Sequence, residues 1–239
     1  MDLIVATSGT VSAVKVKPAV PRTIPIVFAM GGDPVKLGVV ASLNRPGDNI
    51  TGIAFLVNGL ASKQIELLHE LVPKAVVIGF LVNPKDPNAQ PDVKDARAAA
   101  DALGQKLVIG EASTDSELDA AFASFSQQHV AAMFVDAEPF LLDRHKKIIA
   151  LAAQHAVPVV SQFRWFAGDG ALASYGTSLT EANRQLGVYA GRILKGTKPD
   201  DLPVVQSTKF DLVINLKTAK VIGVTVPNAL LATADEVIE

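Results

Sequence analysis

Cysteine is absent from the 239 residues of this chain, which excludes disulfide bonds, cysteine-ligated zinc and thiol nucleophiles. An excess of one charge is also missing, since 22 Lys and Arg stand against 24 Asp and Glu. This balance argues against a nucleic-acid partner, which would require a basic face. No apolar run approaches the ~20 residues of a membrane-spanning helix. The first residues lack the basic and apolar regions of a signal peptide.

Hydrophobic residues make up 49% of the chain and charged residues 19%, a composition typical of a globular protein. Aromatic residues are only 5%, and alanine is abundant. Small side chains of this kind favour helices packed tightly on sheets over an all-β sandwich. The length alone is compatible with one domain or two.

Short apolar runs alternate along the chain with segments of helical spacing. The runs are rich in β-branched residues, as buried parallel strands are, and cover residues 3–7, 24–30, 50–55, 76–82, 106–110, 130–135, 157–161 and 210–214. Apolar spacing predicts helices over residues 65–72, 93–103, 114–125 and 182–193. Thr114 and Glu117 predict a capping box at the start of the third of these. The alternation predicts an α/β fold with parallel sheets.

Polar residues gather where the predicted strands end. In open parallel sheets, ligands bind outside the carboxyl ends of the strands, so these positions are the candidate ligand site. They are Ser8, Gly9, Thr10, Gly32, Asp33, Phe55, Asn83, Asp136, Glu138, Gln162 and Phe163.

Each polar member of this set also fits a purely structural role. Ser8 and Thr10 suit a helix cap, and Asp33 before Pro34 suits an N-cap followed by proline at the first helical position. Asn83 and Glu138 precede prolines, as turn residues often do. Their shared placement at strand ends favours the functional interpretation.

The catalytic and metal-binding motifs that can be matched in the sequence lack the surrounding elements that their function requires. The G-x-G-x-x-A match at 168–173 precedes an extended segment instead of opening a helix, and the S-x-x-K match at 12–15 lacks its companion motifs. The four histidines fall on predicted helices or at their ends, away from the strand ends. We therefore expect no catalytic residue, metal or cofactor.

Several ordered motifs resemble the ABC-transporter substrate-binding proteins of the tryptophan/tyrosine type, over nearly the whole chain. They are IPIVF (24–28) with Asp33-Pro34, ASLNRPG (41–47) leading into NITG (49–52), VNP (82–84), SYG (174–176), ILKG (193–196) with Lys198-Pro199, and NLKTA (215–219).

This resemblance implies a type I periplasmic-binding-protein-like fold of two α/β lobes joined by a hinge. The expected lobes are residues 1–57 with 172–205, and residues 58–171 with 206–239, with crossings near Val57-Asn58-Gly59 and after Gly168-Asp169-Gly170. Lobe closure on a ligand would be a population shift.

The implied function is the capture of a small solute, an amino acid and in this family often an aromatic one, for an ABC permease, without chemistry. Ser8 and Thr10 would hold an α-carboxylate, and Asp33 or Glu138 an α-ammonium. Phe55, Phe163 and Tyr175 would contact the apolar part.

The resemblance also implies a periplasmic location. Family members carry a signal peptide and about two further βα units ahead of the segment matching residues 3–7, so the first lobe is expected to be incomplete. A homodimer through that lobe, or weak ligand binding, would follow.

Two alternatives remain. An enzyme on the same scaffold would use Asp33, Asp136 or Glu138 as acid or base. A regulator's ligand-sensing domain would have the same fold, although no helix-turn-helix pattern accompanies it here.

Overall fold

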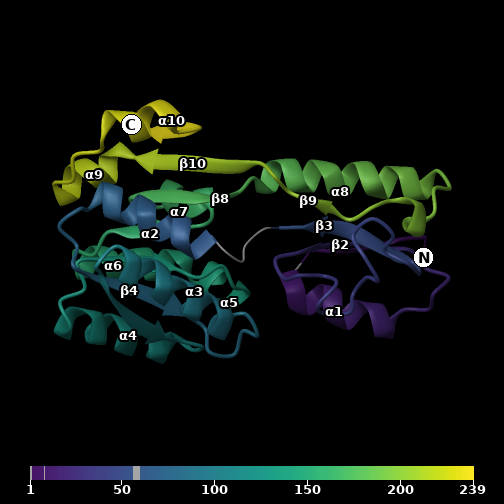
Figure 1. Ribbon diagram of the computed structural model, residues 1–239, viewed down its shortest axis with the longest axis horizontal. Coiled ribbons are helices and arrows are strands. Elements are labelled where there is room, and N and C mark those ends of the chain that lie inside the picture. Colours follow the sequence, from purple (N-terminus) through teal and green to yellow (C-terminus); the bar gives the residue numbers. More distant parts are fainter. Residues whose placement is uncertain (1, 8, 56–59) are drawn as a thin grey trace. The chain divides into compact units, whose positions relative to one another are not determined.

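A computed structural model describes residues 2–7, 9–55 and 60–239, and the chain divides into two compact units (Figure 1). The first unit consists of Met1–Val57 with Thr177–Lys209, and the second of Asn58–Gly176 with Phe210–Glu239. The chain therefore crosses between the units three times, and neither unit is one continuous stretch of sequence.

The first unit is a four-stranded parallel sheet with helices on both faces. Its strand order is β1 (Ile4–Ala6), β2 (Ile26–Met30), β3 (Ile50–Ala54) and β9 (Val205–Gln206). Helices α1 (Gly9–Ala19) and α8 (Leu179–Leu194) lie on opposite faces of β2 and β3 (Figure 1), and the 3-10 helix η1 (Pro199–Asp201) precedes β9.

Strand alternation in β2 explains these two layers. Ile26, Phe28 and Met30 pack in one core with Ala13 of α1. Val27 and Ala29 pack in a second core with α8. Both faces of β2 are thus buried, which accounts for its uninterrupted apolar sequence.

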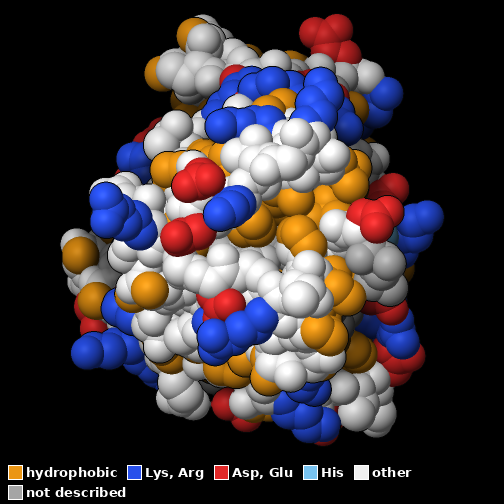
Figure 2. All heavy atoms as spheres, turned by 90° about the vertical axis from the view of Figure 1, so that its right-hand side faces the viewer, with side chains coloured by type: hydrophobic (Ala, Val, Ile, Leu, Met, Phe, Trp, Pro, Cys, Tyr) orange, Lys and Arg blue, Asp and Glu red, His pale blue; other side chains and the backbone are white. Residues whose placement is uncertain are grey.

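Apolar side chains are also visible on the surface of this unit (Figure 2). Val5, on the edge strand β1, is 47% exposed. Val11 and Val14 of α1 are exposed as well.

The second unit is built on a seven-stranded sheet. Its order is β11 (Glu236–Ile238), β10 (Phe210–Asn215), β8 (Ala173–Thr177), β7 (Val159–Ser161), β6 (Ala132–Val135), β4 (Val77–Val82) and β5 (Lys106–Glu111). One face is covered by α2 (Leu60–Leu71), α3 (Ala89–Ala102), α9 (Leu216–Ile222) and α10 (Asn228–Thr233). The other is covered by α4 (Asp115–Gln127), α5 (Pro139–Asp143), α6 (His145–Gln154) and α7 (Arg164–Gly168).

The four helices predicted from apolar spacing are confirmed as α2, α3, α4 and α8. Thr114 caps α4 by accepting from Glu117 N at 3.3 Å, but the Glu117 carboxylate bonds Ser113 instead of closing the predicted reciprocal box. Among the described residues, none of the helices has the length and apolarity needed to cross a bilayer.

The expectation that both sheets are wholly parallel is wrong for β10 and β11. Asn215 N donates to Leu172 O at 2.9 Å and Ser178 N donates to Lys209 O at 3.0 Å, so β8 and β10 run in opposite directions. β11 is parallel to β10. The reversal follows from the chain path, because β8 leads into the first unit and β10 returns from it.

The predicted start of the returning segment at residue 172 also needs correction. β8 pairs with β7 through Val160 and Ala173, so it belongs to the second sheet, and the crossing lies at Gly176–Thr177. Gly168-Asp169-Gly170 is not a crossing but the end of α7 and the turn after it. Residues 206–209 belong to the first unit. The other expected crossing, at 57–59, lies outside the described residues.

Candidate functional site

Glu138 organises the loop after β6. One carboxylate oxygen accepts from Leu141 N at 2.5 Å, and the other accepts from Phe140 N and from Asn83 Nδ2, both at 3.0 Å. Glu138 is thus the N-cap of α5 and also holds the loop after β4. Asn83 Oδ1 is engaged as well, by Lys85 N at 3.0 Å.

Asp136, two residues earlier, is buried with half of its carboxylate unused. Its Oδ1 accepts from Ala137 N at 2.8 Å, whereas Oδ2 is buried without a hydrogen-bond partner. Burial, reinforced by the nearby charge of Asp92, raises the pKa of Asp136 to about 8. Asp92 lies in the first turn of α3, and burial raises its pKa to about 7, with Asp86 and Asp95 adding to the effect. The end of β6 is therefore a place where an unneutralised negative charge is unfavourable.

Gln162 and Phe163 follow β7. Gln162 is 7% exposed, and its Oε1 is also buried without a partner. Its backbone touches β8 closely, because a Cβ built on Gly176 would lie 2.1 Å from the Gln162 carbonyl oxygen. Phe163 stacks on Trp165 with ring centroids 4.6 Å apart. Trp165 is not among the residues predicted from the sequence, although it lies only two positions after the predicted residue Phe163.

In the first unit, Thr10 and Gly32 connect the ends of β1 and β2. Gly32 N donates to Thr10 Oγ1 at 3.0 Å, and a Cβ on Gly32 would lie 2.8 Å from Leu37 Cδ1. Gly9, with φ of 78°, opens α1. The predicted residue Ser8 lies outside the described residues.

Asp33 caps a turn in this unit. Its Oδ1 accepts from Val35 N at 2.9 Å and from Lys36 N at 3.1 Å, and its Oδ2 lies 3.8 Å from Lys36 Nζ. The alternative role of Asp33 as a helix N-cap is not what the structure has, since residues 34–38 form turns. Phe55 follows β3, is half-buried, and donates its N–H to Met30 O at 2.7 Å.

Tyr175 does not join the other predicted residues of its unit. It stacks on Phe210, with ring centroids 5.8 Å apart, and lines a cavity between α2, β8, β10 and α10. None of Asn83, Asp136, Glu138, Gln162 and Phe163 lines that cavity.

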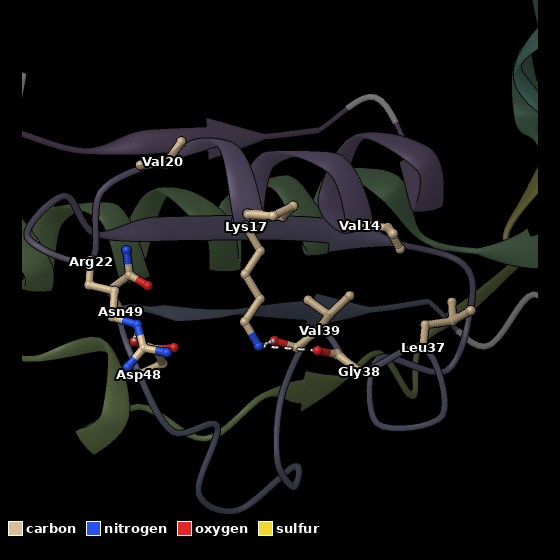
Figure 3. Close-up of a pocket in the computed structure, with 10 residues that line it drawn as sticks. Val14, Lys17, Val20, Arg22, Leu37, Gly38, Val39, Asp48 and Asn49 are labelled. Atoms are coloured by element: carbon tan, nitrogen blue, oxygen red, sulfur yellow. Dashed lines mark hydrogen bonds and ion pairs between the residues drawn. The ribbon is translucent and has the colours of Figure 1, made fainter.

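A hollow of about 390 Å³ in the first unit lies away from the predicted residues (Figure 3). Lys17 of α1 reaches across it and donates to the carbonyls of Gly38 and Val39 at 3.1 and 2.9 Å. Arg22 pairs with Asp48 at 3.5 Å on its rim. Both cations of this lining are thus paired with groups of the same unit.

The histidines lie on helices or directly after them. His145 opens α6, with Nε2 2.8 Å from an Asp169 oxygen, and His69 lies in α2. His129 and His155 follow α4 and α6. In the part of the chain that the structure describes, no cluster of three or more metal-ligating side chains occurs.

The model of the family described as "ABC transporter substrate binding protein" matches residues 1–238. The chain belongs to this family. Its members are substrate-binding proteins, which favours ligand capture over catalysis, and they are typically found outside the cytoplasm.

Two relatives of this chain carry a ligand in their names. A tyrosine-binding protein of Clostridioides difficile (strain R20291) is 28% identical over 199 residues, which are 83% of this chain. The chain spans 57% of that relative's length. A solved Streptococcus pneumoniae ABC domain in complex with L-Trp superposes with a TM-score of 0.85 at 25% identity, covering 99% of this chain and 81% of that one.

A more distant structure bears on the fold alone. An ABC transporter periplasmic solute-binding protein from Actinobacillus succinogenes has a TM-score of 0.66 at 12% identity, and the match covers 92% of this chain and 80% of that one. The chain thus has the type I periplasmic-binding-protein-like fold expected from its sequence.

Proposed function

We propose that this protein captures an amino acid, preferably one with an aromatic side chain, at the carboxyl ends of its β-strands and delivers it to an ABC permease outside the cytoplasmic membrane. Family membership over residues 1–238 carries the proposal. The ligands named for the two relatives support the amino-acid class.

The second unit offers acceptors that lack donors. Asp136 Oδ2 and Gln162 Oε1 are both buried and unpartnered, at the ends of β6 and β7, which neighbour each other in the sheet. An α-ammonium has three N–H donors and a positive charge, so it would satisfy such oxygens and, in place of the proton, balance the charge of an ionised Asp136. Glu138 is less suited to this role than the sequence suggested, because both its oxygens are already bonded.

The first unit offers donors. Thr10 Oγ1 already accepts from Gly32 N, so its hydroxyl proton is free to donate. The first turn of α1 adds backbone N–H groups that have no partner within a helix. A carboxylate is the group that such a combination stabilises.

Aromatic rings are available for the side chain of the ligand. Phe163 and Trp165 form one stacked pair after β7, and Phe55 follows β3 in the first unit. Flat apolar surfaces of this kind suit an indole or phenol ring.

Isothermal titration calorimetry with L-tryptophan, L-tyrosine, tryptamine and indole-3-propionate tests the proposal. We expect the two amino acids to bind, and the two analogues that lack one charged group each to bind at least about tenfold more weakly at the strand-end site. Equal affinity for tryptophan and indole-3-propionate would contradict an ammonium site.

The variant Asp136→Asn sharpens the test. It is expected to weaken tryptophan binding while leaving indole-3-propionate nearly unchanged, because only tryptophan carries the ammonium. Asp101→Asn, at an exposed position in α3, is the matched control. A loss of affinity equal for both ligands would remove Asp136 from the ammonium site.

A further inference from the structure

The cavity beside Tyr175 is a candidate for a second site. It has a volume of about 570 Å³, within the range of small-molecule pockets, and lies wholly in the second unit. Its lining comes from α2, β8, β10 and α10, and from Asp235, which lies just after α10.

An aromatic pair forms part of the lining of the cavity. Tyr175 and Phe210 stack with an interplanar angle of 14°, and both are half-buried. Leu67, Leu212 and Leu230 extend the apolar surface around the rings. Aromatic faces carry negative quadrupole charge, so they attract cations as well as apolar groups.

Carboxylates dominate the rim. Lys63, the one cation in the lining, is paired with Glu66 at 2.8 Å, and this contact raises the pKa of Lys63. The charges of Glu70 and Asp235 remain, and Asp235 uses one oxygen to accept from Leu212 N at 2.8 Å. With Lys63 offset by Glu66, the lining has an excess of negative charge.

We propose that this cavity binds an organic ammonium ion with a flat apolar body, the body on Tyr175 and Phe210 and the cation at the carboxylate rim. An amine is expected here and an amino acid is not, because an α-carboxylate beside the ammonium would face Glu66, Glu70 and Asp235. This site goes beyond the proposed capture of an amino acid and does not depend on it.

Titration with 2-phenylethylamine, followed by calorimetry and by ligand-observed NMR on the full chain, tests the site. Glu70→Gln is expected to weaken binding about threefold to tenfold through the lost charge. Glu70 is exposed, so this variant is expected to fold. Phe210→Leu is expected to weaken binding while retaining apolar bulk. Glu111→Gln, an exposed glutamate at the end of β5, is the matched control.

Asp136→Asn separates this site from the strand ends. Amine binding that survives Asp136→Asn and weakens in Glu70→Gln supports the proposal whether or not tryptophan binds. Amine binding abolished by Asp136→Asn would assign the amine to the strand-end site and overturn it. Equal binding of 3-phenylpropionate, or an unchanged affinity in Glu70→Gln, would overturn it as well.

Discussion

Asp136 and Glu138 lie two residues apart after β6, but their carboxylates have different roles. Glu138 is fully bonded to Asn83 and to the first turn of α5, so it sets the shape of the loops. Asp136 is buried with one oxygen unused. The sequence places both at a strand end, but only their hydrogen bonds separate the structural carboxylate from the one available to a ligand.

Replacing Glu138 by alanine is expected to lower the free energy of unfolding by about 1–3 kcal/mol, since it removes a cap and strands the buried amide of Asn83. Equilibrium urea unfolding measures the loss. Glu138→Gln keeps one acceptor oxygen, so its free energy of unfolding is expected to lie between those of the wild type and Glu138→Ala. A wild-type midpoint for Glu138→Ala would contradict this role.

The raised pKa of Asp136 predicts how stability depends on pH. In the folded state this carboxyl keeps its proton up to about pH 8. In the unfolded state it has its ordinary pKa of 3.8 and loses the proton at a much lower pH. The folded state therefore binds more protons in that window, and the free energy of unfolding of the unliganded protein falls as pH rises from about 4 to 8.

Urea midpoints between pH 5 and 9 measure this slope. Asp136→Asn is expected to flatten it and to be more stable than wild type above pH 8, while Asp101→Asn leaves it unchanged. The raised pKa of Asp92 leaves part of the slope in place. An identical pH profile for Asp136→Asn and wild type would refute the prediction.

For Asp33, the turn that it caps suggests an indirect role in binding. Asp33→Ala removes the acceptor of Val35 N and Lys36 N and is expected to weaken tryptophan binding at least about tenfold. Asp33→Asn keeps an acceptor oxygen and is expected to retain most of the affinity in the same calorimetric titration. If the asparagine variant loses as much as the alanine variant, the charge itself contacts the ligand.

How much of the candidate site was predictable differs from residue to residue. Strand ends could be located because apolar runs stop there, and this gave Asp136 and Gln162. Tyr175 could not be assigned, because its partner Phe210 is far along the chain and only the antiparallel pairing of β8 with β10 brings the two rings together.

At the scale of elements, α8 is predictable and α1 is not. Ala182, Leu186, Tyr189 and Ile193 form a buried stripe with helical spacing, which the sequence displays directly. In α1 the only buried residue is Ala13, and Pro18 lies inside the helix. Because α1 lacks a buried apolar stripe, its position follows from packing on β2 and could not be predicted from its own sequence pattern.

Two leucines of α8 allow a matched test of this stripe. Leu186 is 4% exposed and Leu194 is 62% exposed, so Leu186→Ala is expected to cost about 2–5 kcal/mol and Leu194→Ala less than about 1 kcal/mol. Urea unfolding followed by circular dichroism compares the two identical substitutions. Equal losses would mean that the stripe does not cover the sheet in solution.

At the scale of the whole molecule, each unit has its own buried cores: two on the faces of the four-stranded sheet and two on those of the seven-stranded sheet. The order of elements that builds them could be predicted from the alternating pattern. The exact crossings could not, because Gly168 and Gly170 resemble a linker although they lie at the end of α7 and in the turn after it, within one unit.

Separate cores predict separate unfolding. Differential scanning calorimetry of the unliganded protein is expected to resolve more than one transition, and Leu186→Ala is expected to lower only the transition of the first unit. A single transition whose calorimetric and van't Hoff enthalpies agree would instead show one cooperative unit.

The three crossings of the chain also set an order of events at the ribosome. Strands β1, β2 and β3 of the first unit emerge within Met1–Val57, but the face of β2 that presents Val27 and Ala29 is covered by α8, which follows the intervening Asn58–Gly176. At roughly 5–20 residues per second, synthesis of that interval takes on the order of ten seconds. During that time one apolar face of the nascent sheet is exposed, so we expect chaperones that bind growing chains to bind it.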